Sequence, residues 1–415
     1  MRRTLFTIII ILLIYSFIEL PSFLGLLLLK KIRHIEYNPI STASLSQDDQ
    51  DALQKLIIGK TTYLIHSPVL GWTIKPNGFW WLYRSNSIGL RGDREYQTMP
   101  SNNSIRISSF GDSYTHCDDV KNEETWQEQL QNADHRLEVL NFGVGGYGLD
   151  QAFLRYREEG ALYNSHIILI GFMRENIGRL VNVFRPFYLL GIPLTKPRYF
   201  IRENELILLN NPLSTLNDCS VLLHNPKAFL SKFGENDYYY KLRPKESFLD
   251  FSPSVRLFKL LYYSTYNRYL GNSGRTIYNN KIISYNQNSE AFKICTKLFD
   301  EFYYLVQKNK SLPIIILFPG PEDIKQYHKN RIKSYSSLIH YFDSRGYRYI
   351  DLLDAFDRYG VSSHSDDLFG KSYHHSPLGN LYVAKAILDY LKENNFTDLH
   401  VIKTHIEKKP RLDTN

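Results

Sequence analysis

The chain has 415 residues, of which 43% are hydrophobic, and a formal net charge of +8. That composition supplies the core of one large domain or of two smaller ones. The basic residues are spread thinly and show no zinc or helix-turn-helix spacing, which argues against a nucleic-acid-binding protein.

The N-terminus carries a long apolar run, Leu5 to Leu29, behind Arg2 and Arg3. A helix of that length, rising about 1.5 Å per residue, is long enough for a hydrocarbon layer of roughly 30 Å. A cleavable signal peptide is the alternative, but its apolar region is shorter and no small-residue cleavage site follows here. We therefore predict a single-pass transmembrane anchor over 1–34. Basic residues flank both ends of the run, so the positive-inside rule barely discriminates between the two topologies.

Residues 35–60 read as a polar spacer that ends in a short helix, Gln47 to Ile58. In residues 61–104, closely spaced Gly, Pro and Asn favour strands and turns over helix. We treat this segment as a preamble to the domain that follows it.

From Ile105 onward, short apolar strands alternate with helix-period segments. The predicted strands are Ile105–Phe110, Leu137–Asn141, His166–Gly171, Leu312–Phe318 and Tyr347–Leu352. The predicted helices are Thr125–Asn132, Leu149–Gly160, Ser289–Gln307, Glu322–Arg345 and Leu378–Glu393. This alternation favours an α/β fold with a parallel sheet covered by helices on both faces.

The alternation breaks in an insertion over about residues 178–288. One hairpin is predicted there, from Arg198 to Leu209, with Glu203-Asn204 at its turn. The insertion is rich in Tyr and Phe, so it fits a lid or a substrate-binding subdomain, and a structural elaboration fits equally well. The hydrolase domain is expected to span 61–400, and residues 401–415 to form a flexible tail.

The stretch Gly111-Asp112-Ser113 ends the first predicted strand. Open α/β sheets place their chemistry at the carboxyl ends of the strands. A serine hydroxyl is a weak nucleophile unless a base removes its proton. Ser113 is therefore a candidate nucleophile if the chain also supplies a base and donors for a developing oxyanion.

Three later stretches supply such groups. A glycine turn over residues 141–148 follows the second strand, and glycine lets a backbone N–H approach a reacting oxygen closely. Asn176 closes a stretch that begins at Gly171, after the third strand. A histidine pair, His374-His375, stands just before the last predicted helix. A histidine with a pKa near neutral can take a serine proton and return it to a leaving alcohol.

These four blocks, in this order, resemble those of the SGNH/GDSL hydrolase family over about residues 61–395, apart from the insertion. The resemblance implies a flavodoxin-like three-layer α/β/α core and an esterase that works through an acyl-serine intermediate. It implies Ser113 as the nucleophile and His374 as the general base. It also implies an oxyanion hole made of the Ser113 N–H, Gly146 and Asn176, although Gly143 or Gly145 could serve in place of Gly146. The family pattern favours His374 over His375.

Two positions depart from the family. The family commonly has Asp three residues before the histidine, where this chain has Lys371. Asp367 and Asp366 are close in sequence and are the candidate third members of a triad, although their spacing differs. The family also often has Asp after the asparagine of the third block, where this chain has Ile177.

The resemblance favours a serine esterase acting on a small acyl ester, such as an acetyl group on a glycan of the cell envelope. The domain is expected outside the cytoplasm, tethered to the membrane by the N-terminal helix. An acyltransferase using the same serine and histidine is one alternative. A non-catalytic envelope binding protein is the other, and Lys371 is its best support. The cysteines and histidines form no recognised metal spacing, so no metal and no cofactor are expected.

Overall fold

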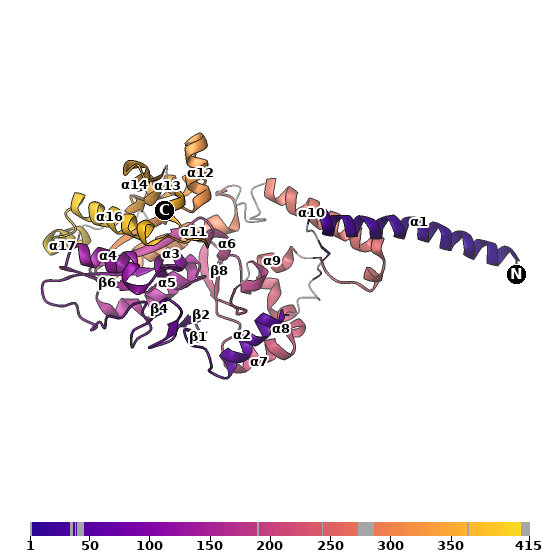
Figure 1. Ribbon diagram of the computed structural model, residues 1–415, viewed down its shortest axis with the longest axis horizontal. Helices are drawn as coiled ribbons and strands as arrows, with labels where there is room; N and C mark the ends of the chain where they lie inside the picture. The colour runs from indigo at the N-terminus through magenta and orange to yellow at the C-terminus, as the bar shows by residue number, and fades with distance from the viewer. Residues whose placement is uncertain are drawn as a thin grey trace.

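Five parallel strands form the central sheet of the computed structural model (Figure 1). They are β5 (Ile105–Phe110), β6 (Leu137–Asn141), β7 (Ile167–Met173), β10 (Leu312–Phe318) and β11 (Tyr349–Asp351). Their spatial order is β6-β5-β7-β10-β11, which is the flavodoxin-like order 2-1-3-4-5. The structure describes residues 2–33, 36–37, 39, 45–188, 191–242, 244–272, 286–362 and 365–407.

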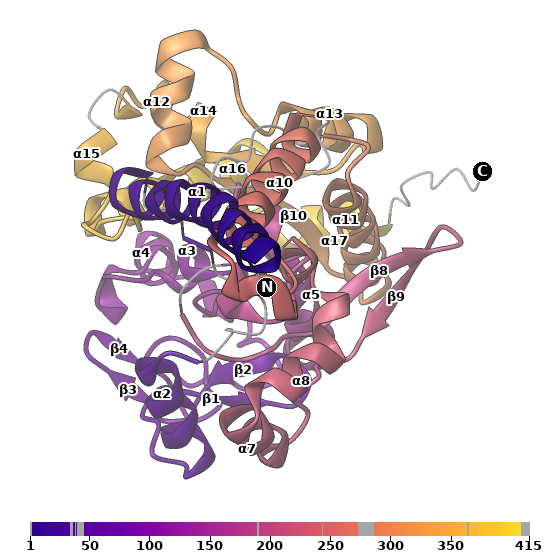
Figure 2. The same cartoon turned by 90° about the vertical axis from the view of Figure 1, so that its right-hand side faces the viewer.

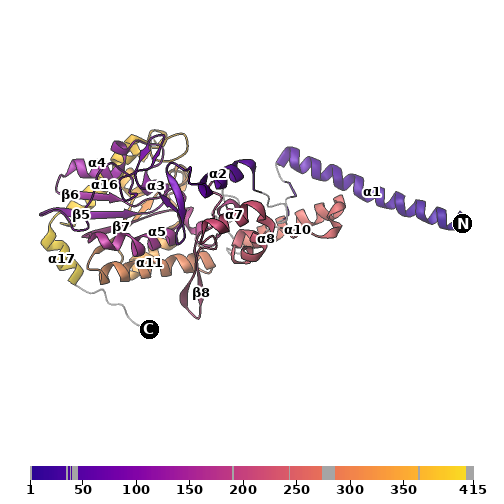
Figure 3. The same ribbon diagram turned by 90° about the horizontal axis from the view of Figure 1, so that it is seen from below.

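Helices cover both faces of this sheet, as Figure 3 shows. One face carries α4 (Trp126–Ala133) and α16 (Pro377–Glu393), and the other carries α5 (Leu149–Glu158) and α11 (Glu290–Lys308). The helix α13 (Ser336–Arg345) packs on α11 through the rings of Phe342 and Phe299, whose centroids lie 4.9 Å apart. A parallel sheet needs apolar side chains on both faces, and every residue of β10 is accordingly buried.

The predicted strands and most of the predicted helices are confirmed to within a few residues. The single predicted helix over Glu322–Arg345 was wrong, because the structure has two helices there, α12 (Pro321–Asn330) and α13. Arg331 ends α12 in the left-handed region with φ of 57°, a conformation that a continuing α-helix cannot hold. The predicted tail was also wrong at its start, because α17 (Leu399–Glu407) buries Ile402. Residues 408–415 lie outside the described residues.

The preamble forms two hairpins, as its turn residues predict. They are β1 (Leu64–Ser67) with β2 (Gly71–Ile74), and β3 (Phe79–Trp80) with β4 (Tyr83–Arg84). The predicted spacer helix is α2 (Gln47–Ile57), which begins with a capping box between Ser46 and Asp49.

The insertion contains the predicted hairpin, formed by β8 (Arg198–Arg202) and β9 (Glu205–Leu209). Glu203 and Asn204 both have positive φ, which is the conformation of a two-residue type I′ turn. The hairpin extends from the body of the molecule in Figure 2. After the hairpin, the insertion continues with the helices α7 (Leu216–His224), α8 (Pro226–Phe233), α9 (Tyr238–Lys241) and α10 (Pro253–Asn272).

The N-terminal helix α1 (Arg2–Arg33) projects away from the body and lies alongside α10 (Figures 1 and 2). The carboxylate of Glu19 accepts hydrogen bonds from the hydroxyls of Ser252 and Ser254, both at 2.7 Å. Within the described residues, no helix has both the length and the apolar character needed to cross a membrane. The predicted transmembrane anchor is therefore not confirmed.

Several short elements complete the fold. They are α3 (Ser113–His116), α6 (Asn176–Arg179), α14 (Leu352–Arg358), α15 (Ser365–Leu368), and the 3₁₀ turns η2 (Asn122–Glu124), η3 (Gly160–Tyr163), η4 (Arg185–Phe187), η5 (Gly234–Asn236) and η6 (Phe248–Phe251). Strands β5 and β7 are neighbours, and the strand order reverses between them. Open α/β sheets bind their ligands in the crevice at such a switch point. Helices α3 and α6 follow these two strands, so the fold brings their first residues to that crevice.

Candidate active site

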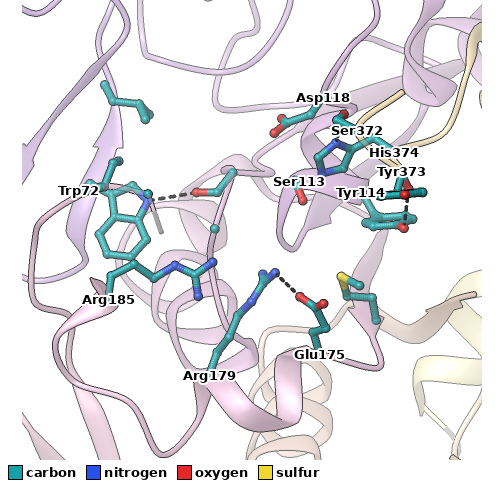
Figure 4. A pocket seen from close by; sticks show the side chains of 16 residues that line it. Trp72, Ser113, Tyr114, Asp118, Glu175, Arg179, Arg185, Ser372, Tyr373 and His374 are labelled. Carbon is teal, nitrogen blue, oxygen red and sulfur yellow. Dashed lines mark hydrogen bonds and ion pairs between the residues drawn. The ribbon is translucent and has the colours of Figure 1, made fainter. Parts of the chain in front are cut away.

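A cavity of about 470 Å³ lies at this switch point. Its walls come from parts of the chain that are far apart in sequence: the preamble, the turns after β5, β6 and β7, the start of the insertion, and the loop before α16. Figure 4 shows the side chains that line it. Among the predicted site residues, Ser113, Gly146 and His374 line this cavity.

Ser113 is the first residue of α3 and is held by the carboxylate of Asp112, the residue before it. Asp112 Oδ1 accepts a hydrogen bond from the Tyr114 N–H at 3.0 Å and so caps the helix. Its Oδ2 accepts hydrogen bonds from Asn176 Nδ2 at 2.9 Å and from Arg179 Nη1 at 3.0 Å. Asp112 is therefore a structural anchor that ties the serine turn to α6.

The glycine turn after β6 packs tightly against α3. A Cβ at Gly143 would lie 2.3 Å from the backbone nitrogen of His116, so only glycine fits there. Gly146 has φ of +82° and lies at the cavity wall, and Trp72 Nε1 donates to the carbonyl of Gly145 at 3.0 Å. Within the described residues, the N–H groups of Ser113 and Gly146 have no backbone acceptor. Both are therefore available to a substrate oxygen.

The structure places Asn176 behind the cavity wall rather than in it. Its side chain is buried, its Oδ1 accepts a hydrogen bond from the Met173 N–H at 3.1 Å, and its Nδ2 donates to Asp112. One amide hydrogen is not engaged by these two contacts. The role of Asn176 as a third oxyanion donor stays a prediction.

His374 lies next to Ser113, with its ring beside the serine hydroxyl (Figure 4). Its Nδ1 is 3.3 Å from Asp119 Oδ2 and 3.0 Å from Ser372 Oγ. Burial alone would lower the pKa of His374. The hydrogen bond to Asp119 and the negative charges of Asp118 and Asp119 outweigh burial and raise this pKa above its usual value.

The carboxylate that contacts His374 thus comes from the loop after α3, not from the loop before α16. The predicted acids Asp366 and Asp367 are exposed on α15, and neither lines the cavity. Asp119 reaches His374 because Cys117 and Asp119 both have positive φ, which turns the chain sharply after the short helix. The structure therefore brings together Ser113, His374 and Asp119.

His375, the alternative base, is part of the core. Its side chain is buried among aromatic rings, and neither ring nitrogen has a hydrogen-bond partner. Burial lowers the pKa of His375 to about 3, so the ring is neutral. The rings around it are those of Tyr114, Phe318, Phe356 and Phe369.

A second carboxylate, Asp118, lines the cavity beside His374 and is held by a buried chain of hydrogen bonds. His116 Nδ1 lies 2.5 Å from Asp118 Oδ1, and His116 Nε2 lies 2.6 Å from the hydroxyl of Tyr63. Burial lowers the pKa of His116 and raises that of Tyr63. The neutral imidazole of His116 therefore lies between the neutral phenol of Tyr63 and the carboxylate of Asp118. Burial opposes the charge on Asp118, but His116 and His374 together lower its pKa. Asp118 thus adds negative charge at the histidine end of the cavity.

The sequence blocks did not single out four charged residues of this site: Asp118, Asp119, Arg179 and Arg185. One signal was present, because two consecutive carboxylates follow the nucleophile by five and six positions. The two arginines lie at the start of the insertion, which no block of the family pattern covers.

No family model matches the chain, and no curated protein matches it. Solved structures do match. A member of the G-D-S-L lipolytic family from Veillonella parvula is 12% identical, and the match covers 70% of this chain and 99% of that one with a TM-score of 0.35. A lipolytic protein of the same family from Desulfitobacterium hafniense is 10% identical, with 68% and 99% covered and a TM-score of 0.29.

A third match is a catalytic mutant of an acetylxylan esterase from Geobacillus stearothermophilus. It is 12% identical, with 69% of this chain and 93% of that one covered and a TM-score of 0.33. The chain resembles GDSL-family lipolytic proteins and acetylxylan esterases. At such identities and TM-scores, the matches do not extend to the substrate or the reaction of this chain.

Proposed function

We propose that the chain is a serine esterase that cleaves an acyl ester in the cavity at the switch point. The observation that carries this proposal is the contact between His374 Nδ1 and Asp119 Oδ2, together with the position of Ser113 beside the same ring (Figure 4). A carboxylate on Nδ1 fixes the tautomer in which Nε2 is free to take a proton. That is the arrangement a serine nucleophile requires.

In this mechanism Ser113 Oγ attacks the ester carbonyl while His374 Nε2 takes its proton. The carbonyl oxygen becomes an oxyanion that the N–H groups of Ser113 and Gly146 stabilise, because both residues line the cavity and neither N–H has a backbone acceptor within the described residues. His374 then gives the proton to the leaving alcohol. A water molecule, deprotonated by the same histidine, attacks the acyl-serine and releases the acid.

Asp119 also bears on the alternative of a non-catalytic binding protein. That alternative drew its support from Lys371, which stands where the family has its aspartate. In this chain the histidine has a carboxylate partner from a different loop, so Lys371 does not leave it without one. An acyltransferase would use the same groups, and it differs only in the acceptor that attacks the acyl-serine.

The narrower parts of the proposal are an acetyl group, an envelope glycan as the alcohol, and a location outside the cytoplasm at the membrane. They derive from the family resemblance. A reporter fused after residue 415 tests the location, because reporter activity restricted to the cytoplasm would overturn it.

Covalent labelling tests the nucleophile directly. A fluorophosphonate probe reacts with an activated serine, so we expect peptide mass spectrometry to find the label on Ser113. Labelling should become faster as the pH rises through the raised pKa of His374, because only the neutral imidazole accepts the proton. A folded chain that is labelled at another serine, or at none, would contradict the proposal.

A further inference from the structure

An arginine that forms no ion pair within the described residues lines the active-site cavity. Arg185 is 7% exposed, and its side chain points into the cavity beside Trp72 (Figure 4). Its guanidinium lies beside the glycine turn, because a Cβ at Gly146 would lie 3.8 Å from Arg185 Nε and 3.9 Å from Nη2. The guanidinium therefore borders the site where the ester carbonyl would bind.

Within the described residues, this guanidinium has neither an ion pair nor a hydrogen bond. Its Nη1 is sealed from solvent without a partner, and its side-chain contact is the ring of Tyr188, 5.6 Å from the guanidinium carbon. Its neighbour Arg179 provides the contrast. Arg179 is also buried, but it donates to Asp112 Oδ2 at 3.0 Å and to the carbonyl of Tyr147 at 2.6 Å.

A buried charge without a partner is strongly disfavoured in a folded protein. Burial, together with the positive charge of Arg179, lowers the pKa of Arg185 to about 9, so the group still carries its charge at neutral pH. Glu175 and Asp112 favour the charge from a distance, but both carboxylates are paired with Arg179. No described carboxylate forms an ion pair with Arg185, so its charge is kept in the cavity without a direct partner. A ligand that brings a negative charge would supply the missing partner.

We propose that Arg185 forms an anion subsite of this cavity and binds a carboxylate or phosphate group of the substrate. A guanidinium suits either group, because its planar fork donates two parallel hydrogen bonds to two oxygens. Asp118 lines the cavity at the histidine end, where Asp119 contacts His374, and Arg185 lies beside the Gly146 turn. The other lining carboxylate, Glu175, is 3.5 Å from Arg179 Nη2. This inference rests on the proposed esterase and narrows its substrates to acyl esters of acidic compounds.

Calorimetry on the Ser113→Ala variant measures anion binding without turnover. The probes are glucuronate, succinate and inorganic phosphate, with glucose as the neutral counterpart. We expect at least one of the three anions to bind, glucose to bind more weakly, and Arg185→Gln in the same background to weaken the anion by about thirtyfold or more. The probe that binds distinguishes a sugar acid, a dicarboxylic acyl group and a phosphate as the source of the charge.

Two further variants complete the test. Arg358→Gln removes an exposed arginine of α14 and should leave anion affinity unchanged. Arg185→Lys keeps the positive charge but loses the forked pair of guanidinium donors, so its anion affinity should fall between those of the parent and Arg185→Gln. If Arg185→Gln does not fold, Arg185→Lys takes its place in the comparison. Equal anion affinity with Arg and Gln at position 185, or no binding of any probe anion by the parent, would overturn the inference. Because binding is measured without catalysis, an inactive chain that still binds anions through Arg185 would contradict only the esterase.

Discussion

Replacing His374 with alanine is expected to lower kcat/KM for 4-nitrophenyl acetate by about 10⁴-fold or more, while the chain stays folded. His374 is the cavity residue beside Ser113 that can remove the serine proton, and without it the hydroxyl is a weak nucleophile. The measurement is the initial rate of 4-nitrophenolate release at several substrate concentrations. Circular dichroism and thermal melting of each variant establish that it is folded.

Two other histidines serve as controls for this substitution. His328→Ala removes an exposed histidine of α12 and should leave the rate unchanged. His375→Ala removes a neutral ring from an aromatic cluster, so it should lower the melting temperature through the cavity it leaves. A His374→Ala variant that keeps most of the parent's rate would contradict the role of this residue as the base.

Replacing Asp119 with asparagine is the second prediction with a large effect. The expected loss in kcat is about 10²–10⁴-fold, because an amide no longer favours the tautomer in which His374 Nε2 accepts a proton. Asparagine has nearly the same shape as aspartate, so the loss in kcat comes from the missing carboxylate rather than from altered packing. The double substitution Asp366→Asn with Asp367→Asn is the matched control, since it removes two exposed carboxylates that do not line the cavity.

The pH dependence of the same variant checks the cause. Asp119 helps to raise the pKa of His374, and the base works only when neutral, so the parent's rate should rise with pH through a value above 6.5. In Asp119→Asn this rise should move to lower pH, because part of the charge that favoured the protonated ring is gone. If the Asp366→Asn, Asp367→Asn double variant loses activity while Asp119→Asn keeps it, the result would instead support Asp366 or Asp367 as the partner of His374.

The strands of the sheet could be predicted because they depend on local patterns, whereas their flavodoxin-like order was implied by the family resemblance. Strands β5, β6 and β10 begin and end where predicted, since each contains several apolar residues and is followed closely by glycine. Ser113, Gly146 and His374 could be placed together for a related reason. The carboxyl ends of parallel strands meet at one edge of the sheet, and a family pattern marks the histidine loop.

The partner of His374 could not be predicted from the same information. Asp119 reaches the ring only through the left-handed residues Cys117 and Asp119, and a positive φ at a residue other than glycine has no clear sequence signal. Sequence distance pointed to Asp366 and Asp367 instead, although α15 holds both at the surface. Arg185 escaped prediction because it lies in the insertion, whose packing on the cavity depends on tertiary contacts.

The most direct test of the esterase proposal is a comparison of the parent chain with Ser113→Ala on 4-nitrophenyl acetate. The proposal predicts turnover by the parent and no rate above the buffer reaction for the folded variant, because the acyl-serine cannot form without the hydroxyl. A folded Ser113→Ala chain that hydrolyses the ester as fast as the parent would contradict the proposal.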